Sequence, residues 1–404
     1  MKKYNRLNNP YTLQFSFIPP QFIERAGITS EIMENFIREV PTYRGIFITG
    51  VRGSGKTVML GDIRNRISKL RNWITIDLNP ESDLLNSLAH MLYQIPDIKP
   101  LFMGAKLDLS ALGIGVGFEK TDYIAANEDD ALCKMLTIMK KKGKKLLITI
   151  DEVTYSKDVA RFSHALSSYA GRDLDVYVLM TGLKENIDSI KNEKSLTFLY
   201  RAKNYKLETL NIMAISLDYQ KTLSIDGKLA IDLANMTMGY PLAFQAVGYH
   251  CWNAKCTDAD WNGDHLIKNI ETELDISLSE LAYDKIWDGL SSKDREILAA
   301  IGELSARTGR ELVKVEDVRK KTGISSDTFT RYRKRLIDSG IVDGKTYGHL
   351  RIALPRFWEY IMNKEVGCYG YHDRNDVRLR YEINELSSDD KKRLLTYIDK
   401  LKKR

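Results

Sequence analysis

A glycine-rich octapeptide at residues 50–57 carries the residue types that bind phosphate groups. Its sequence, Gly-Val-Arg-Gly-Ser-Gly-Lys-Thr, fits the pattern G-x-x-x-x-G-K-[ST] of a P-loop. The glycines let the backbone wind tightly, so that successive amide groups can point at one anion. Lys56 would bring an ammonium group to the β- and γ-phosphates of a nucleotide, and Thr57 would offer its hydroxyl to Mg²⁺.

The flanks of this motif are those that a P-loop requires, because an apolar strand precedes it and a helical pattern follows it. The positive end of that helix would face the same anion. The alternative is a chance match at a glycine-rich turn. We predict a nucleotide site, and the residues assigned to it are Gly50, Val51, Arg52, Gly53, Ser54, Gly55, Lys56, Thr57 and Val58.

Two adjacent carboxylates, Asp151 and Glu152, follow the apolar run at residues 146–150, which is typical of a strand buried on both faces. The first carboxylate after such a strand lies at the carboxyl edge of the sheet, beside the P-loop. We therefore predict that Asp151 and Thr57 hold Mg²⁺ and that Glu152 accepts a proton from the water that attacks the γ-phosphate. The alternative is that the acidic pair merely opens a loop.

Two further positions complete the predicted catalytic set. Thr181 ends a third apolar strand, and it can orient the attacking water if that strand lies beside residues 146–150. Arg201 follows about twenty positions later and could stabilise the charge on a γ-phosphate, in its own subunit or a neighbour's. The alternatives are an ordinary threonine at a strand end and a surface arginine.

Strands and helices alternate around these residues, which predicts a parallel sheet with helices on both faces. The predicted strands are residues 45–50, 73–78, 146–150 and 176–180. The predicted helices are residues 28–39, with Thr29 or Ser30 as N-cap, 58–70, 80–95, 129–139 and 159–169. Residues 106–119 alternate and contain three glycines, like a hairpin insertion. The run Lys140–Lys145 is interpreted as a solvated helix end that suits the helix dipole.

After residue 206 the strand signal fades, and the remaining chain divides into three parts. Residues 207–286 carry helical spacing and form a small helical subdomain, and residues 364–404 form a polar tail with a C-terminal helix. Between them, residues 287–363 show a helix, a short helix, a turn at Gly323, a further helix and two strands. This order predicts a winged helix-turn-helix.

The helix after Gly323, which is the second helix of the predicted helix-turn-helix, would face a major groove of DNA. Six basic and three acidic residues lie in residues 325–351, a modest bias toward phosphate. The residues assigned to DNA contact are Thr330, Arg331, Arg333, Lys334 and Lys345. The alternative is a domain for protein interaction or autoinhibition.

Composition excludes several classes of protein. With 43 % hydrophobic and 28 % charged residues, the 404-residue chain is neither disordered nor collagen-like. No apolar stretch is long enough for a membrane span, and four cysteines are too few for a disulfide scaffold. We expect a cytoplasmic protein. His250, Cys251, Cys256 and His265 fit no usual zinc spacing and are interpreted as core residues.

The chain resembles the AAA-type P-loop ATPases of the STAND and origin-recognition-like branch, in particular bacterial and archaeal proteins with a C-terminal winged helix. The resemblance rests on residues 50–57, 146–152, 181–182 and 239–245, on Asn9-Pro10-Tyr11 and on the distal helix-turn-helix, and it covers about residues 8–362. It implies an α/β P-loop NTPase core in residues 1–206, with residues 207–286 as an α-helical lid. It also implies ATP and ADP as ligands.

In that family the Gly-x-Pro region closes over the bound nucleotide, which assigns Tyr240 and Pro241 to nucleotide binding. No arginine lies between Gly239 and Trp252, where origin-recognition relatives have a lid arginine. This departure favours the STAND side and a slow ATP/ADP switch. The choice of ATP over GTP rests on the resemblance.

The leading hypothesis is therefore a Mg²⁺-dependent ATPase switch that couples nucleotide state to the winged helix. A second hypothesis is a DNA-binding regulator or loader licensed by ATP. A third is a signalling or defence scaffold that recruits proteins with little turnover. Adenine nucleotide is the expected ligand, the hypotheses leave open double-stranded DNA, self-association and protein partners, and no membrane partner is expected.

Overall fold

The computed structural model separates the chain into two units, which are described one at a time. One unit is Pro10–Ala214, and the other is Met1–Asn9 together with Ile215–Arg404. The structure describes residues 6–14, 18–105, 107–109, 123–124, 127–257, 263–366, 387, 390–395 and 397.

A parallel sheet of five strands, in the order β2-β5-β6-β1-β7, forms the centre of the first unit. The strands are β1 (Gly45–Thr49), β2 (Trp73–Leu78), β5 (Lys145–Ile150), β6 (Val176–Gly182) and β7 (Lys203–Lys206). The first four are the strands predicted from the sequence. The fifth was missed because Lys-Asn-Tyr-Lys is mostly polar, a composition that suits an edge strand with one buried side chain, Tyr205.

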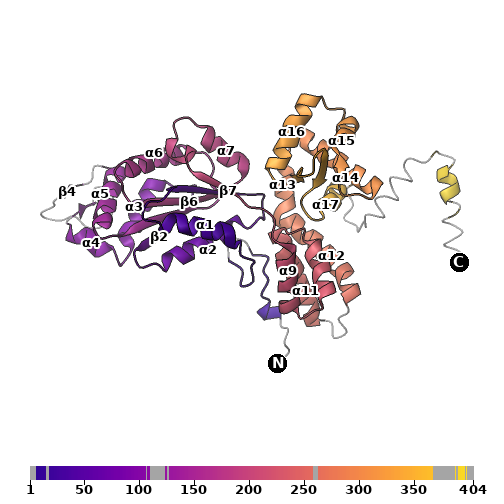
Figure 1. Ribbon diagram of the computed structural model, residues 1–404, viewed down its shortest axis with the longest axis horizontal. Coiled ribbons are helices and arrows are strands. Elements are labelled where there is room, and N and C mark those ends of the chain that lie inside the picture. Colours follow the sequence, from indigo (N-terminus) through magenta and orange to yellow (C-terminus); the bar gives the residue numbers. More distant parts are fainter. Residues whose placement is uncertain are drawn as a thin grey trace. The chain divides into compact units, whose positions relative to one another are not determined.

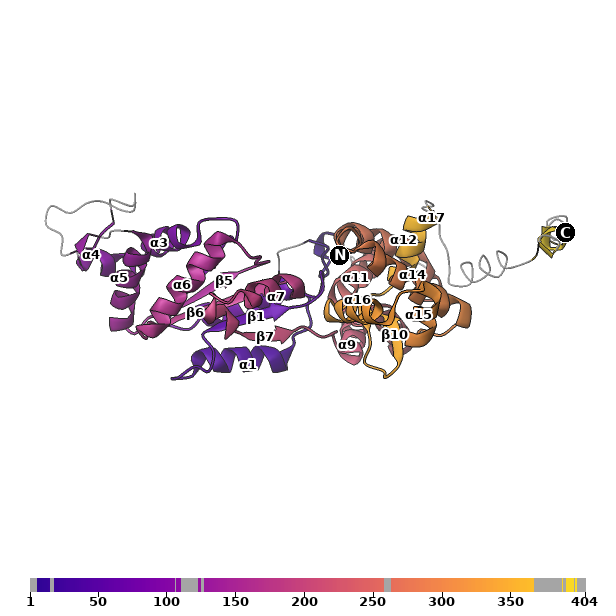
Figure 2. The same ribbon diagram turned by 90° about the horizontal axis from the view of Figure 1, so that it is seen from above.

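Helices cover both faces of this sheet, as predicted (Figures 1 and 2). On one face α1 (Ala26–Ile37) and α2 (Lys56–Ser68) bury Phe36 and Ile63 against the strands. The other face packs against the following helices: α3 (Leu84–Gln94), α5 (Glu128–Lys141), α6 (Lys157–Gly171), α7 (Lys184–Asn192) and α8 (Thr197–Tyr200). Both faces of the strands are apolar because neither meets water.

Two predictions of helix boundaries were wrong. The first helix begins at Ala26, so Thr29 lies inside it and is buried, and its N-cap position is Arg25. The helix predicted at residues 80–95 begins only at Leu84. The Asp83 carboxylate accepts a hydrogen bond from Asn86 N and so caps the helix at this point.

A short helix that the sequence did not indicate, α4 (Lys99–Gly104), precedes the predicted insertion. Beyond it β3 (Leu107–Asp108) pairs in parallel with β4 (Tyr123–Ile124). Most of the predicted hairpin at residues 106–119 lies outside the described residues.

The second unit begins with helices, as predicted for residues 207–286. They are η1 (Arg6–Asn8), α9 (Ile212–Leu223), which contains the boundary between the units, α10 (Gly227–Met236), α11 (Pro241–Thr257), α12 (Gly263–Leu278), the π-helical turn η3 (Ser279–Tyr283) and α13 (Asp284–Asp288). Near the amino end of the chain, Asn9 Nδ2 donates hydrogen bonds to Tyr249 O and Asn253 Oδ1 of α11.

The rest of the second unit contains the predicted helices and two predicted strands, with one further short strand, and its assignment as a winged helix-turn-helix stays a prediction. The helices are α14 (Ser292–Thr308), α15 (Val315–Thr322), α16 (Ser326–Asp338) and α17 (Phe357–Val366). The strands β8 (Val313–Lys314), β9 (Val342–Asp343) and β10 (His349–Ile352) form an antiparallel sheet in the order β8-β10-β9. Gly323 makes the turn between α15 and α16 with φ of 63°.

Among the described residues, none of the helices combines the length and apolar character that crossing a lipid bilayer requires. In the tail, the Ser387 hydroxyl accepts a hydrogen bond from Asp390 N, and residues 390–395 are helical.

Candidate functional site

The P-loop connects the carboxyl end of β1 to the first turn of α2. Gly53 and Gly55 have φ of 77° and 84°, the left-handed conformation that winds the loop and that glycine adopts most easily. Ser54 N donates to Val51 O at 3.1 Å, and a Cβ on Gly50 would lie 2.4 Å from Ser54 Oγ. The loop is therefore tight at Gly50, where an added Cβ would displace the Ser54 hydroxyl.

Lys56 begins α2 and is only 7 % exposed. Its Nζ donates to the carbonyl oxygens of Gly50 and Val51, each at 3.1 Å. Burial lowers the pKa of this ammonium to about 8, while Glu152 and Asp151 act in the opposite direction. The ammonium group is thus held inside the loop by neutral acceptors, which a phosphate group could replace.

Thr57, Asp151 and Thr181 converge beside the loop, although they come from three different elements. The Thr57 hydroxyl donates to Asp151 Oδ2 at 2.7 Å, and the Thr181 hydroxyl donates to Asp151 Oδ1. Because β5 and β6 are neighbours, their carboxyl ends meet at the sheet edge that carries the P-loop. The predicted proximity of these residues is confirmed.

Glu152 occupies a left-handed conformation with φ of 53°, which costs a residue with a side chain about 1 kcal/mol or more. Two hydrogen bonds impose it, from Glu152 N to Thr181 Oγ1 at 3.0 Å and from Val153 N to Thr181 O at 2.8 Å. Gly182 permits this approach, because a Cβ there would lie 3.1 Å from Val153 O. The Glu152 side chain is 63 % exposed and lies 3.9 Å from Arg52 Nη1.

Thr181 consequently holds both acids in place, a role that the sequence did not suggest. Its hydroxyl donates to Asp151 and accepts from the Glu152 amide, and it is fully buried. We therefore treat Thr181 as a positioning residue, and its contact with an attacking water stays a prediction.

Two charged residues near the loop were missed in the sequence. Arg25, just before α1, donates through Nη2 to Ser54 O at 3.0 Å and to Glu208 O at 2.9 Å, and burial lowers its pKa to about 10. Glu185, at the start of α7, contributes to the electrostatic field at Lys56. An arginine directly before a predicted helix is too common a pattern to have indicated the first.

The residues present fit a magnesium nucleotide. Ser54 Oγ is buried inside the P-loop and has no hydrogen-bond partner among the described residues. A buried hydroxyl without a partner is costly, and a phosphate oxygen would satisfy it. The hydroxyl–carboxylate pair of Thr57 and Asp151 supplies oxygen ligands of the kind that Mg²⁺ prefers.

Arg201 lies at the opposite edge of the sheet from the P-loop. It is exposed and follows α8, directly before β7, whose first residue, Lys203, is in register with Ile46 near the start of β1. The strand residues between the two edges span about 13 Å or more at 3.3 Å per residue. The prediction that Arg201 reaches the nucleotide of its own subunit is therefore wrong, because the strand runs away from the site.

Tyr240 and Pro241 belong to the second unit, where Pro241 is the first residue of α11, as expected for proline at a helix start. Gly239 has φ of 73° and makes the turn before them. The Tyr240 ring is 3 % exposed and stacks on Tyr283 of η3, with centroids 6.4 Å apart and planes at 20°. Its assignment to nucleotide binding stays a prediction.

The residues assigned to DNA contact lie on α16 and in the wing. Thr330, Arg331, Lys334 and Lys345 are exposed, whereas Arg333 is half-buried. The Thr330 hydroxyl donates to Ser326 O within the helix. Arg331 lies over the Tyr332 ring at 5.2 Å, and Tyr332 is partly buried.

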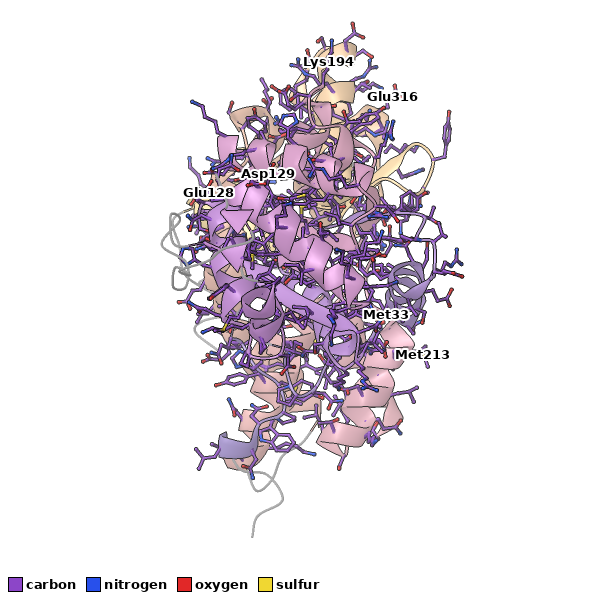
Figure 3. All side chains as sticks on the ribbon, turned by 90° about the vertical axis from the view of Figure 1, so that its left-hand side faces the viewer. Met33, Glu128, Asp129, Lys194, Met213 and Glu316 are labelled. Atoms are coloured by element: carbon purple, nitrogen blue, oxygen red, sulfur yellow. The ribbon has the colours of Figure 1, made fainter. Side chains whose placement is uncertain are left out.

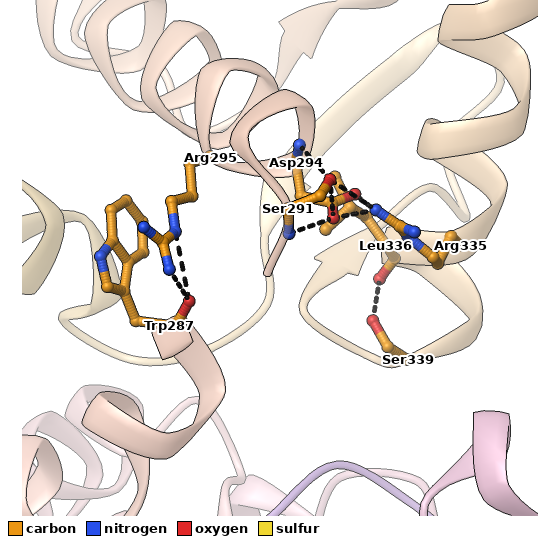
Figure 4. Close-up of polar contacts among 7 residues, drawn as sticks. All are labelled: Trp287, Ser291, Asp294, Arg295, Arg335, Leu336 and Ser339. Carbon is orange, nitrogen blue, oxygen red and sulfur yellow. Dashed lines mark hydrogen bonds and ion pairs between the residues drawn. The ribbon is translucent and has the colours of Figure 1, made fainter. Parts of the chain in front are cut away.

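Two of the basic residues counted in this module are already paired with acids. Arg335 Nε donates to Asp294 Oδ1 at 3.2 Å, and Asp294, which is 1 % exposed, also accepts from Ser291 in a capping box (Figure 4). Arg351 pairs with Asp343 at 3.0 Å and with Glu311 at 3.6 Å. The positive bias inferred from the sequence is therefore weaker on the folded surface.

We expect Arg335→Ala to destabilise the second unit by about 2 kcal/mol, because it leaves the buried Asp294 carboxylate without its cation. The value is below that of a fully buried pair because half of the Arg335 side chain is in water. Thermal unfolding followed by circular dichroism measures the change. Lys334→Ala, at the exposed neighbouring position, is the control and should change stability by less than about 0.5 kcal/mol. Equal effects of the two substitutions would contradict the prediction.

Comparison with known proteins supports the fold. A family model described as a domain of unknown function (DUF8462) matches residues 280–361. No curated protein sequence matches the chain. The ORC2 protein of Aeropyrum pernix, solved in ADPNP–ADP complexes, is similar in structure with a TM-score of 0.57 and 13 % identity, over 88 % of this chain and 98 % of that one.

Two weaker structural matches are the ADP form of the same protein and Cdc6p from Pyrobaculum aerophilum. The first has a TM-score of 0.48 and 14 % identity and covers 87 % of this chain and 96 % of the other. The second has a TM-score of 0.43 and 14 % identity and covers 87 % of this chain and 97 % of the other. The fold assignment rests on the ADPNP–ADP structure. The chain thus has an α/β P-loop NTPase fold like that of this ORC2 protein, with a five-stranded parallel sheet between helices, followed by a helical region and a distal group of helices with a three-stranded antiparallel sheet.

Proposed function

We propose that this chain is a Mg²⁺-dependent ATPase switch that binds ATP and ADP at the P-loop and hydrolyses ATP slowly. The observation that carries the proposal is the hydrogen bond of 2.7 Å between the Thr57 hydroxyl and Asp151. This pair supports the proposal because a hydroxyl, a carboxylate and an ammonium group such as that of Lys56 are the three groups that a magnesium triphosphate requires. The choice of adenine follows from the similarity to a protein solved with ADPNP and ADP.

The proposed reaction uses few groups. Mg²⁺, held by Thr57 and Asp151, would neutralise charge on the phosphates. Glu152 accepts a proton from water as the water oxygen forms a bond to the γ-phosphorus. The bond from that phosphorus to the β,γ-bridging oxygen breaks, and ADP and inorganic phosphate are the products. Thr181 supports this step by holding the backbone that presents Glu152.

Glu152→Gln should lower phosphate release at least 100-fold, because an amide cannot accept the proton. ADP affinity measured by calorimetry should change less than threefold, since the Glu152 side chain is largely exposed and its ion pair with Arg52 is long. Glu185→Gln is the matched control, an exposed acid near Lys56 to which we assign no chemistry. Equal turnover in Glu152→Gln and wild type would contradict the assigned role. No turnover in either protein would remove the enzyme and leave a binding switch.

Within the second unit, a series of side-chain contacts connects the predicted lid to the predicted winged helix. Tyr283 stacks on Tyr240 at one side and contacts Phe357 of α17 edge-on, with centroids 4.8 Å apart. The Tyr283 hydroxyl donates to Pro355 O, and Arg356 pairs with Asp275 of α12. These contacts support a switch in which the turn at residues 239–241 and the winged helix move as one body. The absence of arginine between residues 239 and 252 supports slow turnover of the STAND type.

For Arg201 we retain the role toward a neighbouring subunit. Its exposed position, with Tyr200 66 % exposed beside it, supports contact with a second copy of the chain. We expect Arg201→Ala and Lys56→Ala each to lose hydrolysis alone. When the two variant proteins are mixed, ATP hydrolysis should recover to about one quarter of the wild-type rate or more. In a mixed assembly the Arg201→Ala subunit keeps an intact P-loop, and a neighbouring Lys56→Ala subunit supplies the arginine. Absence of any recovery in assays over a range of protein concentrations would contradict this role.

A DNA-binding regulator is the second candidate, favoured by Arg331 and Lys334, which are both exposed on α16. Salt-dependent duplex binding that is lost in Arg331→Ala/Arg333→Ala would support it, and binding that is unaffected would remove it. The third hypothesis, a scaffold that recruits proteins, would then account for the winged helix.

A further inference from the structure

The amino edge of the central sheet, opposite the P-loop, concentrates positive charge. Three loops precede the strands β2, β5 and β6 there, at residues 69–72, 140–145 and 172–175, and we call their surface the amino-edge patch. Together they hold eight basic and two acidic residues, a net charge of +6. The whole chain carries only +7, so almost all of its excess charge lies in this patch.

Backbone hydrogen bonds bring the three loops side by side. Lys145 N donates to Asn72 O at 2.8 Å, and Leu146 N donates to Asp175 O at 2.9 Å. Lys144 Nζ also donates to Arg71 O at 2.9 Å. From the sequence, we interpreted only the lysines after α5, as a solvated helix end. The fold brings basic residues of two further loops next to them.

In the described part of the chain, the acidic residues of the patch leave most of its basic side chains without an ion pair. Asp173 is held by Lys140 at 2.7 Å and by Arg44 at 2.7 Å, so two cations already neutralise it. Four other side chains are exposed and make no hydrogen bond or ion pair with the described residues: Lys69, Arg71, Lys141 and Lys142. Their charges repel one another and would gain from an external polyanion.

We propose that the amino-edge patch binds the phosphate backbone of nucleic acid without sequence specificity. Lysines on flexible stems suit phosphate contacts, which fix position and carry no sequence information. The three strands are about 4.8 Å apart, so the loops span about 10–15 Å, the length of about three or four phosphates along one strand. This surface is independent of the proposed ATPase activity and of the winged helix.

The composition of the patch argues against a membrane as the partner. A membrane surface would require exposed apolar side chains beside the lysines. The large apolar residues of this edge are instead buried, with Trp73 5 % exposed and Tyr177 fully covered. Lys145 lies over both rings, 5.6 Å from the centroid of Trp73 and 5.9 Å from that of Tyr177.

The test uses the full chain with Arg331→Ala/Arg333→Ala as background, which removes the predicted winged-helix contact. Into it we place a quadruple alanine variant of Lys69, Arg71, Lys141 and Lys142. Affinity for a fluorescent 20-base-pair duplex is measured by anisotropy between 50 and 200 mM salt. We expect at least a tenfold loss of affinity at 50 mM salt and a salt slope shallower by about 3.6, because four phosphate contacts disappear.

The matched control removes four exposed lysines elsewhere: Lys157, Lys194 (Figure 3), Lys221 and Lys228. It should lower affinity less than threefold, and ADP binding should be unchanged in both variants, which shows that the P-loop is intact. An unchanged duplex affinity in the quadruple variant, or an equal loss in the control, would overturn the proposal. So would a quadruple variant that loses binding to phosphatidylserine vesicles but keeps binding to the duplex, which would assign the patch to membranes.

Discussion

Lys56→Ala should weaken ADP and ATP binding by about 100- to 1000-fold. The ammonium is buried in the P-loop, where the phosphates would bind. Truncating one partner of a buried, hydrogen-bonded charge pair costs about 3–4 kcal/mol, and each 1.4 kcal/mol is tenfold in affinity. Isothermal calorimetry with purified protein, MgCl₂ and ADP measures the loss.

The fold should survive this substitution. Among the residues that the structure describes, the Lys56 side chain makes hydrogen bonds only to the carbonyl oxygens of Gly50 and Val51, and its burial disfavours the charge, as the lowered pKa shows. Lys69→Ala, at the other end of the same helix, is the control and should leave ADP affinity within a factor of two. If Lys56→Ala bound ADP as tightly as wild type, the nucleotide site and the function built on it would both be wrong.

Gly302→Ala should destabilise the winged-helix region by about 3 kcal/mol or more. A Cβ at this position of α14 would lie 1.8 Å from Cε3 of the Trp358 ring and 2.2 Å from Cζ3. Trp358 is 6 % exposed and belongs to α17, so the ring cannot move without disturbing the packing of both helices. Alanine favours a helix over glycine by about 1 kcal/mol, which the steric conflict outweighs.

Thermal unfolding followed by circular dichroism and tryptophan fluorescence measures this effect. Gly289→Ala is the matched control in the same unit, because a Cβ there would meet only Ile286 O at 3.5 Å and Lys285 O at 3.6 Å. We expect it to change stability by less than about 0.5 kcal/mol. Gly302→Ala/Trp358→Leu should recover part of the loss by returning space to the added methyl group. A midpoint equal to that of wild type in Gly302→Ala would contradict the close packing of α17 against α14 at this glycine.

Local patterns in the sequence were enough for most elements and for the content of the site. The P-loop and the acidic pair are short motifs in which neighbours in sequence are neighbours in space, so their chemistry is visible without a fold. Four strands were predicted because each is a short run rich in apolar and β-branched residues, a composition that favours a strand. The strand β7 was missed because an edge strand with one buried residue has no such run.

Contacts between distant residues could not be predicted in this way. The shared hydroxyl of Thr181, the bond from Arg25 to Ser54 and the pairing of Arg335 with Asp294 each join residues 29 or more positions apart. The same limit affected Arg201, which was assigned a catalytic role from its position about twenty residues after Thr181. Strand direction, which places it at the far edge, is a property of the assembled sheet.

The amino-acid sequence by itself determined the P-loop, the acids at the end of β5 and the order of α/β core, helices and winged helix, because each depends on residues within one or two elements. Only the tertiary structure decided which side chains share a hydrogen bond, which edge of the sheet Arg201 occupies and that three basic loops form one patch. The physical reason is that strand order and register bring residues together through backbone hydrogen bonds. Those pairings depend on the packing of the entire sheet, and no local pattern records them.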